Sequence, residues 1–190
     1  MMKIDVSLFS DRYFVRILNR EDVPLILSLC VTNPQYYRHC PPFVTQQSVI
    51  DDMKALPPGK DDSDKYYIGY FDRDKLIAVM DFIMAYPDKE TAFIGFFMTD
   101  ASVQNAGVGS DIIDELCRYL KNAGLSGVKL GWVSDNPQAV HFWHRNGFRE
   151  TGVTYDTDSY TVTVAKRELT DCQPNNGKPP ENVKKIYGSD

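Results

Sequence analysis

The sequence predicts a single α/β (α+β) domain with a central mixed, mostly antiparallel sheet of about seven strands, flanked by about four helices. Three apolar segments joined by short polar turns follow one another in the middle of the chain, which is typical of an antiparallel meander. After Thr99 the apolar residues take helical spacing, and helices then alternate with strands. No internal repeat or interior linker interrupts the chain, so residues 1–169 are expected to form one domain. Residues 170–190 are polar and are interpreted as a C-terminal tail.

The first third of the chain is predicted to contain a strand, two short helices and two loops. Residues 13–18 are rich in β-branched and aromatic residues, as in a strand. Asn19 or Asp22 can cap the helix that follows. Residues 32–43, rich in Tyr, Pro, Asn and His, are predicted to be a loop, and a second helix is expected before the Pro- and Asp-rich loop at 57–64.

The remainder of the chain is predicted to alternate between strands and helices. Clusters of Asp, Lys, Glu, Arg and Pro mark the turns between the central strands. Gly124 suits a left-handed C-terminal cap, and Pro137 suits the first position of a helix. The expected elements are strands at 66–71, 75–86 and 91–99, a helix from Val108 that ends at Gly124, a strand at 128–132, a helix that begins at Asn136–Pro137, and strands at 148–155 and 159–168.

Charge and composition exclude several classes of protein. Lys and Arg number 21 and Asp and Glu number 26, which gives a formal net charge of −5. An acidic protein gains nothing from a phosphate backbone, so no nucleic acid partner is expected. No apolar run approaches the ~18 residues of a membrane span, and the N-terminus lacks the apolar core of a signal peptide. We therefore expect a cytoplasmic protein with no membrane partner.

The cysteines indicate neither a metal site nor a disulfide framework. Cys30, Cys40, Cys117 and Cys172 contain no Cys-x-x-Cys pair, the spacing common in structural zinc sites. Reduced and mostly buried thiols are expected instead. The helix expected after Asn136 carries two histidines three positions apart, but no third ligand is evident nearby, so no metal is predicted.

The sharpest local signal is Gln104-Asn105-Ala106-Gly107-Val108-Gly109, between an expected strand and an expected helix. Glycines allow a tight turn and the close approach of a ligand, and the unpaired N–H groups of a first helical turn suit a pyrophosphate. An ordinary strand-to-helix turn would also fit the pattern. A nucleotide P-loop is disfavoured because no lysine follows Gly109, and a dinucleotide-binding fold because the loop follows a meander and has Gly-x-Gly spacing.

Two segments together resemble the GNAT superfamily of N-acetyltransferases. Gln-x-x-Gly-x-Gly at 104–109 resembles the family's acetyl-coenzyme A loop. The segment 136–148 resembles the family signature Asn-x-x-Ala-x-x-Phe-Tyr-x-x-x-Gly-Phe. One expected helix and one expected strand separate the two segments, as they do in the family, and the resemblance extends over residues 14–168.

The resemblance implies the GNAT fold and an N-acetyltransferase that moves the acetyl group of acetyl-coenzyme A to a primary amine of a small molecule. Backbone N–H groups of the loop are implied to bind the pyrophosphate, and the end of the preceding strand the pantetheine arm. One N–H, at Met98 or Thr99, is implied to polarise the thioester carbonyl. The residues implied to contact the coenzyme are Phe97, Met98, Thr99, Gln104, Asn105, Ala106, Gly107, Val108, Gly109, Ser110, Asn136, Phe142 and Trp143.

The proton-transfer groups depart from the family pattern. Trp143 stands where the family commonly has a tyrosine that protonates the leaving thiolate, and an indole N–H is no acid near neutral pH. The expected strand at 91–99 contains no carboxylate to match the family's frequent glutamate base. Asp81 either points into a cleft or faces outward from an alternating strand. The candidate base is Asp81, and the candidate acids are Tyr155, Tyr160 and His144.

The acceptor is expected against the first two helices and the turn between the last two strands, as in the family. Tyr36, Tyr37 and Asp156 lie there and would suit a cationic amine, although the two tyrosines would equally suit helix packing. Acetylation of a protein N-terminus or lysine, a noncatalytic coenzyme-A-binding regulator and a nucleotide-binding module stay open as alternatives. Family members often dimerise, so a homodimer is one expectation.

Overall fold

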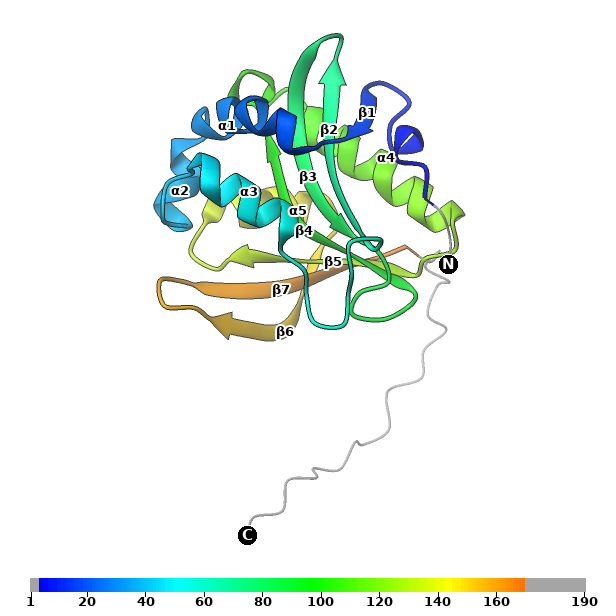
Figure 1. The fold of residues 1–190 in the computed structure, drawn as a ribbon. Coiled ribbons are helices and arrows are strands. Elements are labelled where there is room, and N and C mark those ends of the chain that lie inside the picture. The colour runs from blue at the N-terminus through cyan, green and yellow to red at the C-terminus, as the bar shows by residue number, and fades with distance from the viewer. Residues whose placement is uncertain (1–3, 170–190) are drawn as a thin grey trace, which may run out of the picture.

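A seven-stranded sheet in the order β1-β2-β3-β4-β5-β7-β6 is the centre of the fold (Figure 1). The computed structural model describes residues 4–169, and the predicted tail at 170–190 lies outside them. Neighbouring strands are antiparallel except β4 and β5, which are parallel. The strands are β1 (Phe14–Ile17), β2 (Lys65–Asp72), β3 (Lys75–Ile83), β4 (Thr91–Thr99), β5 (Gly127–Val133), β6 (Arg149–Asp156) and β7 (Thr161–Glu168).

The helices divide between the two faces of the sheet. Phe9, Leu116 and Trp143 belong to one buried cluster, which places α4 and α5 on one face. Ile26 and Val49 belong to a second cluster, which places α1 and α3 on the other face, over β2–β4 (Figure 1). The helices are α1 (Val23–Val31), α2 (Pro34–His39), α3 (Gln46–Lys54), α4 (Val108–Asn122) and α5 (Pro137–Arg145), with 3-10 turns at Val6–Leu8, Arg20–Asp22 and Ala101–Val103.

The observed elements confirm the predicted fold class and correct two of the predicted elements. All seven predicted strands form, and helices begin after Asn136 and Gly107 as predicted. The segment 32–43 is not a loop throughout, because Pro34–His39 forms α2. The third strand is shorter than predicted and ends at Ile83 rather than near Tyr86. No helix among residues 4–169 has the length and apolar character needed to cross a membrane.

Burial of α4 against the sheet is expected to contribute strongly to stability. Leu116 is fully buried on α4, so Leu116→Ala should lower the free energy of unfolding by about 2–5 kcal/mol, through lost apolar contact and the cavity left behind. Leu8 is 60% exposed, so Leu8→Ala should change it by less than about 0.5 kcal/mol. Urea denaturation of both variants would measure this, and equal losses would contradict the assignment of the core.

Candidate active site

A cavity of about 620 Å³ opens where β4 and β5 diverge. The two strands pair only from Thr91 with Gly127 to Ile94 with Leu130, although β4 continues to Thr99 and β5 to Val133. Residues of both strands beyond the last pair line the cavity. The divergence therefore leaves a V-shaped notch in the middle of the sheet.

A β-bulge in β4 lies at the start of this notch. Asp81 of β3 is opposite Phe96, and the next residue, Phe82, is opposite Ile94, so Gly95 is the extra residue of the bulge. A Cβ atom at Gly95 would lie 2.6 Å from the Asp81 carboxylate oxygen Oδ2. Glycine is therefore required at this position, and the bulge redirects β4 away from β5.

Alternate backbone groups of β4 face the notch. The Asp100 N–H donates to the Ile77 carbonyl of β3 at 2.8 Å. Because hydrogen-bonded pairs alternate along an antiparallel ladder, Met98 also bonds to β3, whereas Phe97 and Thr99 turn their N–H and C=O groups toward the notch. The Thr99 carbonyl there accepts from the side-chain amides of Asn33, at 3.0 Å, and Gln104, at 3.3 Å.

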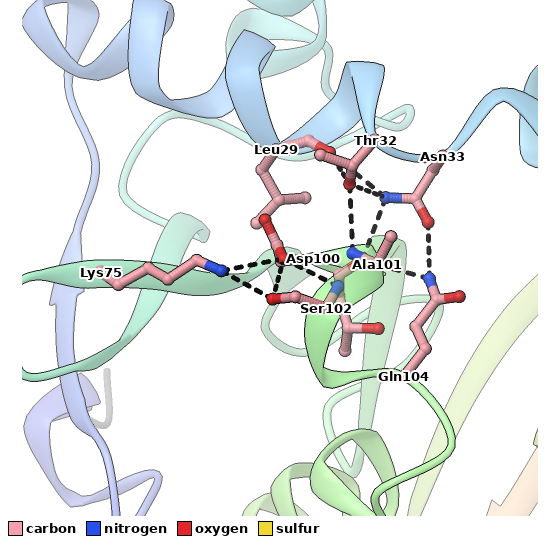
Figure 2. Close-up of polar contacts among 9 residues, drawn as sticks. Leu29, Thr32, Asn33, Lys75, Asp100, Ala101, Ser102 and Gln104 are labelled. Carbon is pink, nitrogen blue, oxygen red and sulfur yellow. Dashed lines mark hydrogen bonds and ion pairs between the residues drawn. The ribbon is translucent and has the colours of Figure 1, made fainter.

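One buried asparagine connects the helical wall of the cavity with the glycine-containing loop (Figure 2). Asn33 precedes α2; its Nδ2 also donates to Leu29 O at 3.2 Å, and its Oδ1 accepts from Gln104 Nε2 at 2.5 Å. Beside it, Thr32 Oγ1 accepts from the Ala101 N–H at 3.1 Å. These contacts fix the start of α2 against the end of β4, and an Asn-Pro pair at a helix start was the sequence signal that could have predicted α2.

The glycine-containing loop passes directly into α4. Gly107 has φ +84° and precedes the helix, a conformation that favours glycine. A Cβ at this residue would meet nothing within 4 Å, and Gly107, Gly109 and Ser110 line the cavity. The free N–H groups at the start of α4 therefore lie beside open space, as a site for a phosphate group requires.

The opposite wall on this face is aromatic. Asn136 caps α5, because its Oδ1 accepts from the Ala139 N–H at 3.1 Å. The Phe142 ring stacks on the Phe97 ring, with 6.0 Å between ring centres. The Trp143 ring packs against the same Phe97 ring, with 5.9 Å between ring centres. Asn136, Phe142 and Trp143 all line the cavity, as do Phe97, Met98, Thr99, Gln104 and Asn105, whereas Ala106 and Val108 of the predicted set do not.

Tyr36, Cys40 and Tyr160 line the other end of the cavity. The Tyr36 ring packs edge-on against Phe96 at 5.9 Å, next to the bulge. Tyr37 instead packs against Tyr36 and Phe43 and does not line the cavity. The Cys40 residue was missed by sequence reasoning, because a single cysteine in a predicted loop carries no pattern of its own.

Of the other predicted acceptor and acid residues, Tyr160 lines the cavity, whereas Tyr155, Asp156 and His144 do not. Tyr155 is 61% exposed on β6, and the Asp156 carboxylate accepts from Thr161 Oγ1 at 2.7 Å. Tyr160, four residues after the strand ends, lines the cavity instead. His144 bonds to Glu150 at 2.7 Å on the outer side of α5. Among residues 4–169, no three His, Cys, Asp or Glu side chains gather as a metal site would need.

Asp81 is neither an outward residue nor part of the cavity lining. It is buried on β3, and its Oδ2 pairs with Lys65 Nζ at 2.8 Å, while Oδ1 has no hydrogen-bond partner. Burial raises the pKa of Asp81 above its ordinary value, and the hydrogen bond from Lys65 opposes this in part. The carboxylate lies beside the cavity-lining residue Gly95.

Comparison with known proteins gives a consistent result. The model of the acetyltransferase (GNAT) family matches residues 31–148. None of the curated proteins matches the sequence closely enough to be counted as a relative.

Solved structures show the same fold at low sequence identity. An acetyltransferase from Thermus thermophilus has a TM-score of 0.66 and 20% identity, covering 82% of this chain and 96% of its own. The ribosomal-protein-S18-alanine N-acetyltransferase from Escherichia coli has a TM-score of 0.59 and 14% identity, and the match covers 90% of this chain and 99% of that protein. A chimera of the Vibrio cholerae spermidine N-acetyltransferase has a TM-score of 0.62 and 18% identity, and the match covers 84% of this chain and 96% of that protein.

Removing the cation beside Asp81 should destabilise the fold. In Lys65→Met the buried carboxylate loses its counter-charge, and the free energy of unfolding at neutral pH should fall by about 3–5 kcal/mol. Lys75→Met is the matched control: Lys75 also pairs with an aspartate, Asp100, but its side chain is 55% exposed, so the loss should be below about 1 kcal/mol.

The same variant should show a distinct pH dependence. A carboxyl group whose folded pKa is raised binds more protons in the folded state, so its destabilising effect grows as pH rises above the ordinary aspartate range. The deficit of Lys65→Met should therefore shrink as pH is lowered into the acidic range. Urea denaturation at several pH values would measure it, and a constant deficit would contradict the electrostatic explanation.

Proposed function

Because this chain belongs to the acetyltransferase (GNAT) family and is an acetyl-CoA-dependent acetyltransferase, we propose that it transfers the acetyl group to a primary amine of a small molecule. One observation carries the proposal. A single cavity passes from the free N–H groups at the start of α4, through the notch between β4 and β5, to Tyr36, Cys40 and Tyr160. It offers one end to the coenzyme and the other to the acceptor.

The residues present fit the coenzyme. The space beside Gly107 and the first turn of α4 suits the pyrophosphate, which requires N–H donors and no side chain in the way. The free backbone edge of β4 suits the amide groups of the pantetheine arm, which would pair with it like an added strand. The stacked rings of Phe97 and Phe142 give the arm an apolar wall.

A backbone donor on β4 is proposed to polarise the thioester carbonyl. The sequence resemblance implied that this donor is the N–H of Met98 or of Thr99. The pairing of β4 with β3, however, uses the Met98 N–H in a hydrogen bond to β3. The proposal therefore moves to the notch-facing N–H groups of Thr99 and Phe97. A donor held by a strand needs no reorganisation as the oxyanion forms, which is why such groups lower the barrier.

Closure of the acceptor end favours a small acceptor over a peptide. Cys40, directly after α2, and Tyr160, directly before β7, both line this end of the cavity, and Cys40 contributes to the raised pKa of the Tyr160 hydroxyl. His39 of α2 lies 3.7 Å from Asp135 in the turn after β5. These contacts join α2 to the far side of the notch, where an extended peptide would need an open groove.

The attacking amine must lose a proton before it becomes a nucleophile. Asp81 is proposed to accept this proton through a water, because it adjoins the cavity wall at Gly95 and burial keeps its pKa raised. The family's usual coenzyme supplies an activated acetyl group as a thioester. Positioning of the two reactants in one cavity supplies much of the remaining rate.

Gly107→Ala should weaken coenzyme binding specifically. The methyl group would occupy the open space beside the phosphate site, and φ +84° would strain the backbone. Gly59→Ala is the matched control, with φ +79° and no neighbour within 4 Å, in a loop away from the cavity. Both should lose about 1 kcal/mol of stability, but only Gly107→Ala should raise the Kd for coenzyme A in calorimetry by about tenfold or more.

The proposed activity is tested by thiol release from acetyl-coenzyme A with pooled amines, polyamines, amino acids and peptides. Release that depends on a small amine supports the proposal, with a blank lacking acceptor to subtract reaction of the chain's own cysteines. Release only with peptides would favour acetylation of proteins. Tight coenzyme binding without release from any pool would favour a noncatalytic binder.

A further inference from the structure

The residue of α5 at the family position of the acid does not provide a proton for the leaving thiolate. Trp143 occupies the family position of the tyrosine acid, and its ring is packed against Phe97, Phe142 and Phe148 at 4.9–5.9 Å between ring centres. An indole cannot act as an acid near neutral pH. A proton donor therefore has to be another side chain that lines the cavity.

Four side chains that line the described cavity are phenols, thiols or imidazoles, the kinds of group that donate protons in enzyme sites: Tyr36, Cys40, His141 and Tyr160. His141 belongs to an exposed stripe of α5 with Gln138 and Arg145, at the solvent rim of the coenzyme side. Tyr36 lies on α2, Cys40 directly follows α2 and Tyr160 directly precedes β7, all on the acceptor side. They form a cluster, which we call the thiol cluster.

The thiol cluster has a cysteine at its centre. Cys40 lines the cavity together with Tyr36 and Tyr160, and its side chain is among the causes that raise the pKa of both hydroxyls. Cys40 is a free, half-buried thiol. The Tyr36 ring is held by Phe96 at 5.9 Å, and the start of α2 is held by Asn33 on the Thr99 carbonyl. The cluster is thus fixed to the same stretch of β4 that forms the notch.

We propose that Cys40 is the proton donor to the leaving thiolate, with the Tyr36 and Tyr160 hydroxyls holding its sulfur. This assignment rests on the proposed acetyl transfer to an amine. As the amine nitrogen bonds to the acetyl carbon, the carbon–sulfur bond breaks and its electron pair stays on the coenzyme sulfur. The Cys40 proton passes to that sulfur, and the proton lost from the new amide nitrogen restores the Cys40 thiol. Atoms and charge therefore balance over one turnover.

A thiol suits this role better than either tyrosine. Proton transfer between two thiols joins groups of the same kind and has little thermodynamic cost. The hydrogen bond with Cys40, together with burial, raises the pKa of Tyr160 to about 12. Burial, and then the neighbouring Cys40, raises the pKa of Tyr36 well above its usual value. Both hydroxyls stay protonated and can donate hydrogen bonds to the sulfur once its proton has left.

The proposal is tested by comparing two acetyl donors, acetyl-coenzyme A and its selenoester, in which selenium replaces the sulfur. A selenolate leaves readily without a proton. Cys40→Ala should lower kcat with the thioester by about 10- to 100-fold, with KM for the donor and Kd for coenzyme A unchanged, and should return close to wild type with the selenoester. Tyr160→Phe should show a smaller loss of the same kind. Tyr155→Phe, which removes an exposed hydroxyl from the adjacent strand, should match wild type with both donors.

Each other outcome overturns the proposal in a recognisable way. Equal losses of Cys40→Ala with both donors would assign Cys40 a structural role. An acetylated Cys40 peptide that forms without acceptor and decays at the rate of turnover, seen by mass spectrometry, would make Cys40 a nucleophile instead. Full activity of Cys40→Ala with the thioester would remove it from the reaction. No transfer by the wild-type chain to any amine would defeat the proposed function, and this assignment with it.

Discussion

The end of backbone pairing between β4 and β5 is the constraint on which the rest of the site depends. Two parallel strands that separate after Ile94 and Leu130 leave N–H and C=O groups in the middle of a sheet without strand partners. Such groups have to be satisfied by side chains or by a ligand. Asn33 and Gln104 satisfy the Thr99 carbonyl, and the remaining groups are available to the bound coenzyme. The bulge at Gly95, which accommodates the Asp81 carboxylate, marks the place where this separation starts.

Most residues that the sequence assigns to the coenzyme line the cavity, and this placement was predictable because it is encoded locally. The segment from Gln104 to Gly109 places its glycines at the start of an amphipathic helix, and the segment from Asn136 to Phe148 combines a cap, a helix and a glycine. Their contacts along the cavity then follow from the positions of α4 and α5. Ala106 and Val108 fall outside the lining, because a loop that turns into a helix presents only some of its residues to one side.

The acceptor half was not predictable from sequence, because it depends on contacts between distant segments. The six residues of α2 are too few to show helical periodicity, and the helix is held in place by Asn33, whose partners Thr99 and Gln104 lie 66 and 71 positions away. Asp81 was ambiguous because alternation assigns a face only where one side of a sheet is exposed. β3 is covered on both sides, so nearly every residue in it is buried, charged or not.

The two walls of the cavity differ in chemistry, and this explains how a tryptophan can stand where related sequences have a tyrosine. On the side of α5, Phe97, Phe142, Trp143 and Phe148 form one packed aromatic group, which holds its shape but offers no acid. On the side of α2 and β7, the cavity is lined by hydroxyl and thiol groups. Both walls adjoin the notch in which the thioester would lie. Under the proposed role of Cys40, the α2 side of the cavity supplies the acid that the α5 side lacks, provided that α2 stays in position. The proposed chemistry therefore depends on Asn33, because its hydrogen bonds to Thr99 and Gln104 hold the start of α2 against the end of β4.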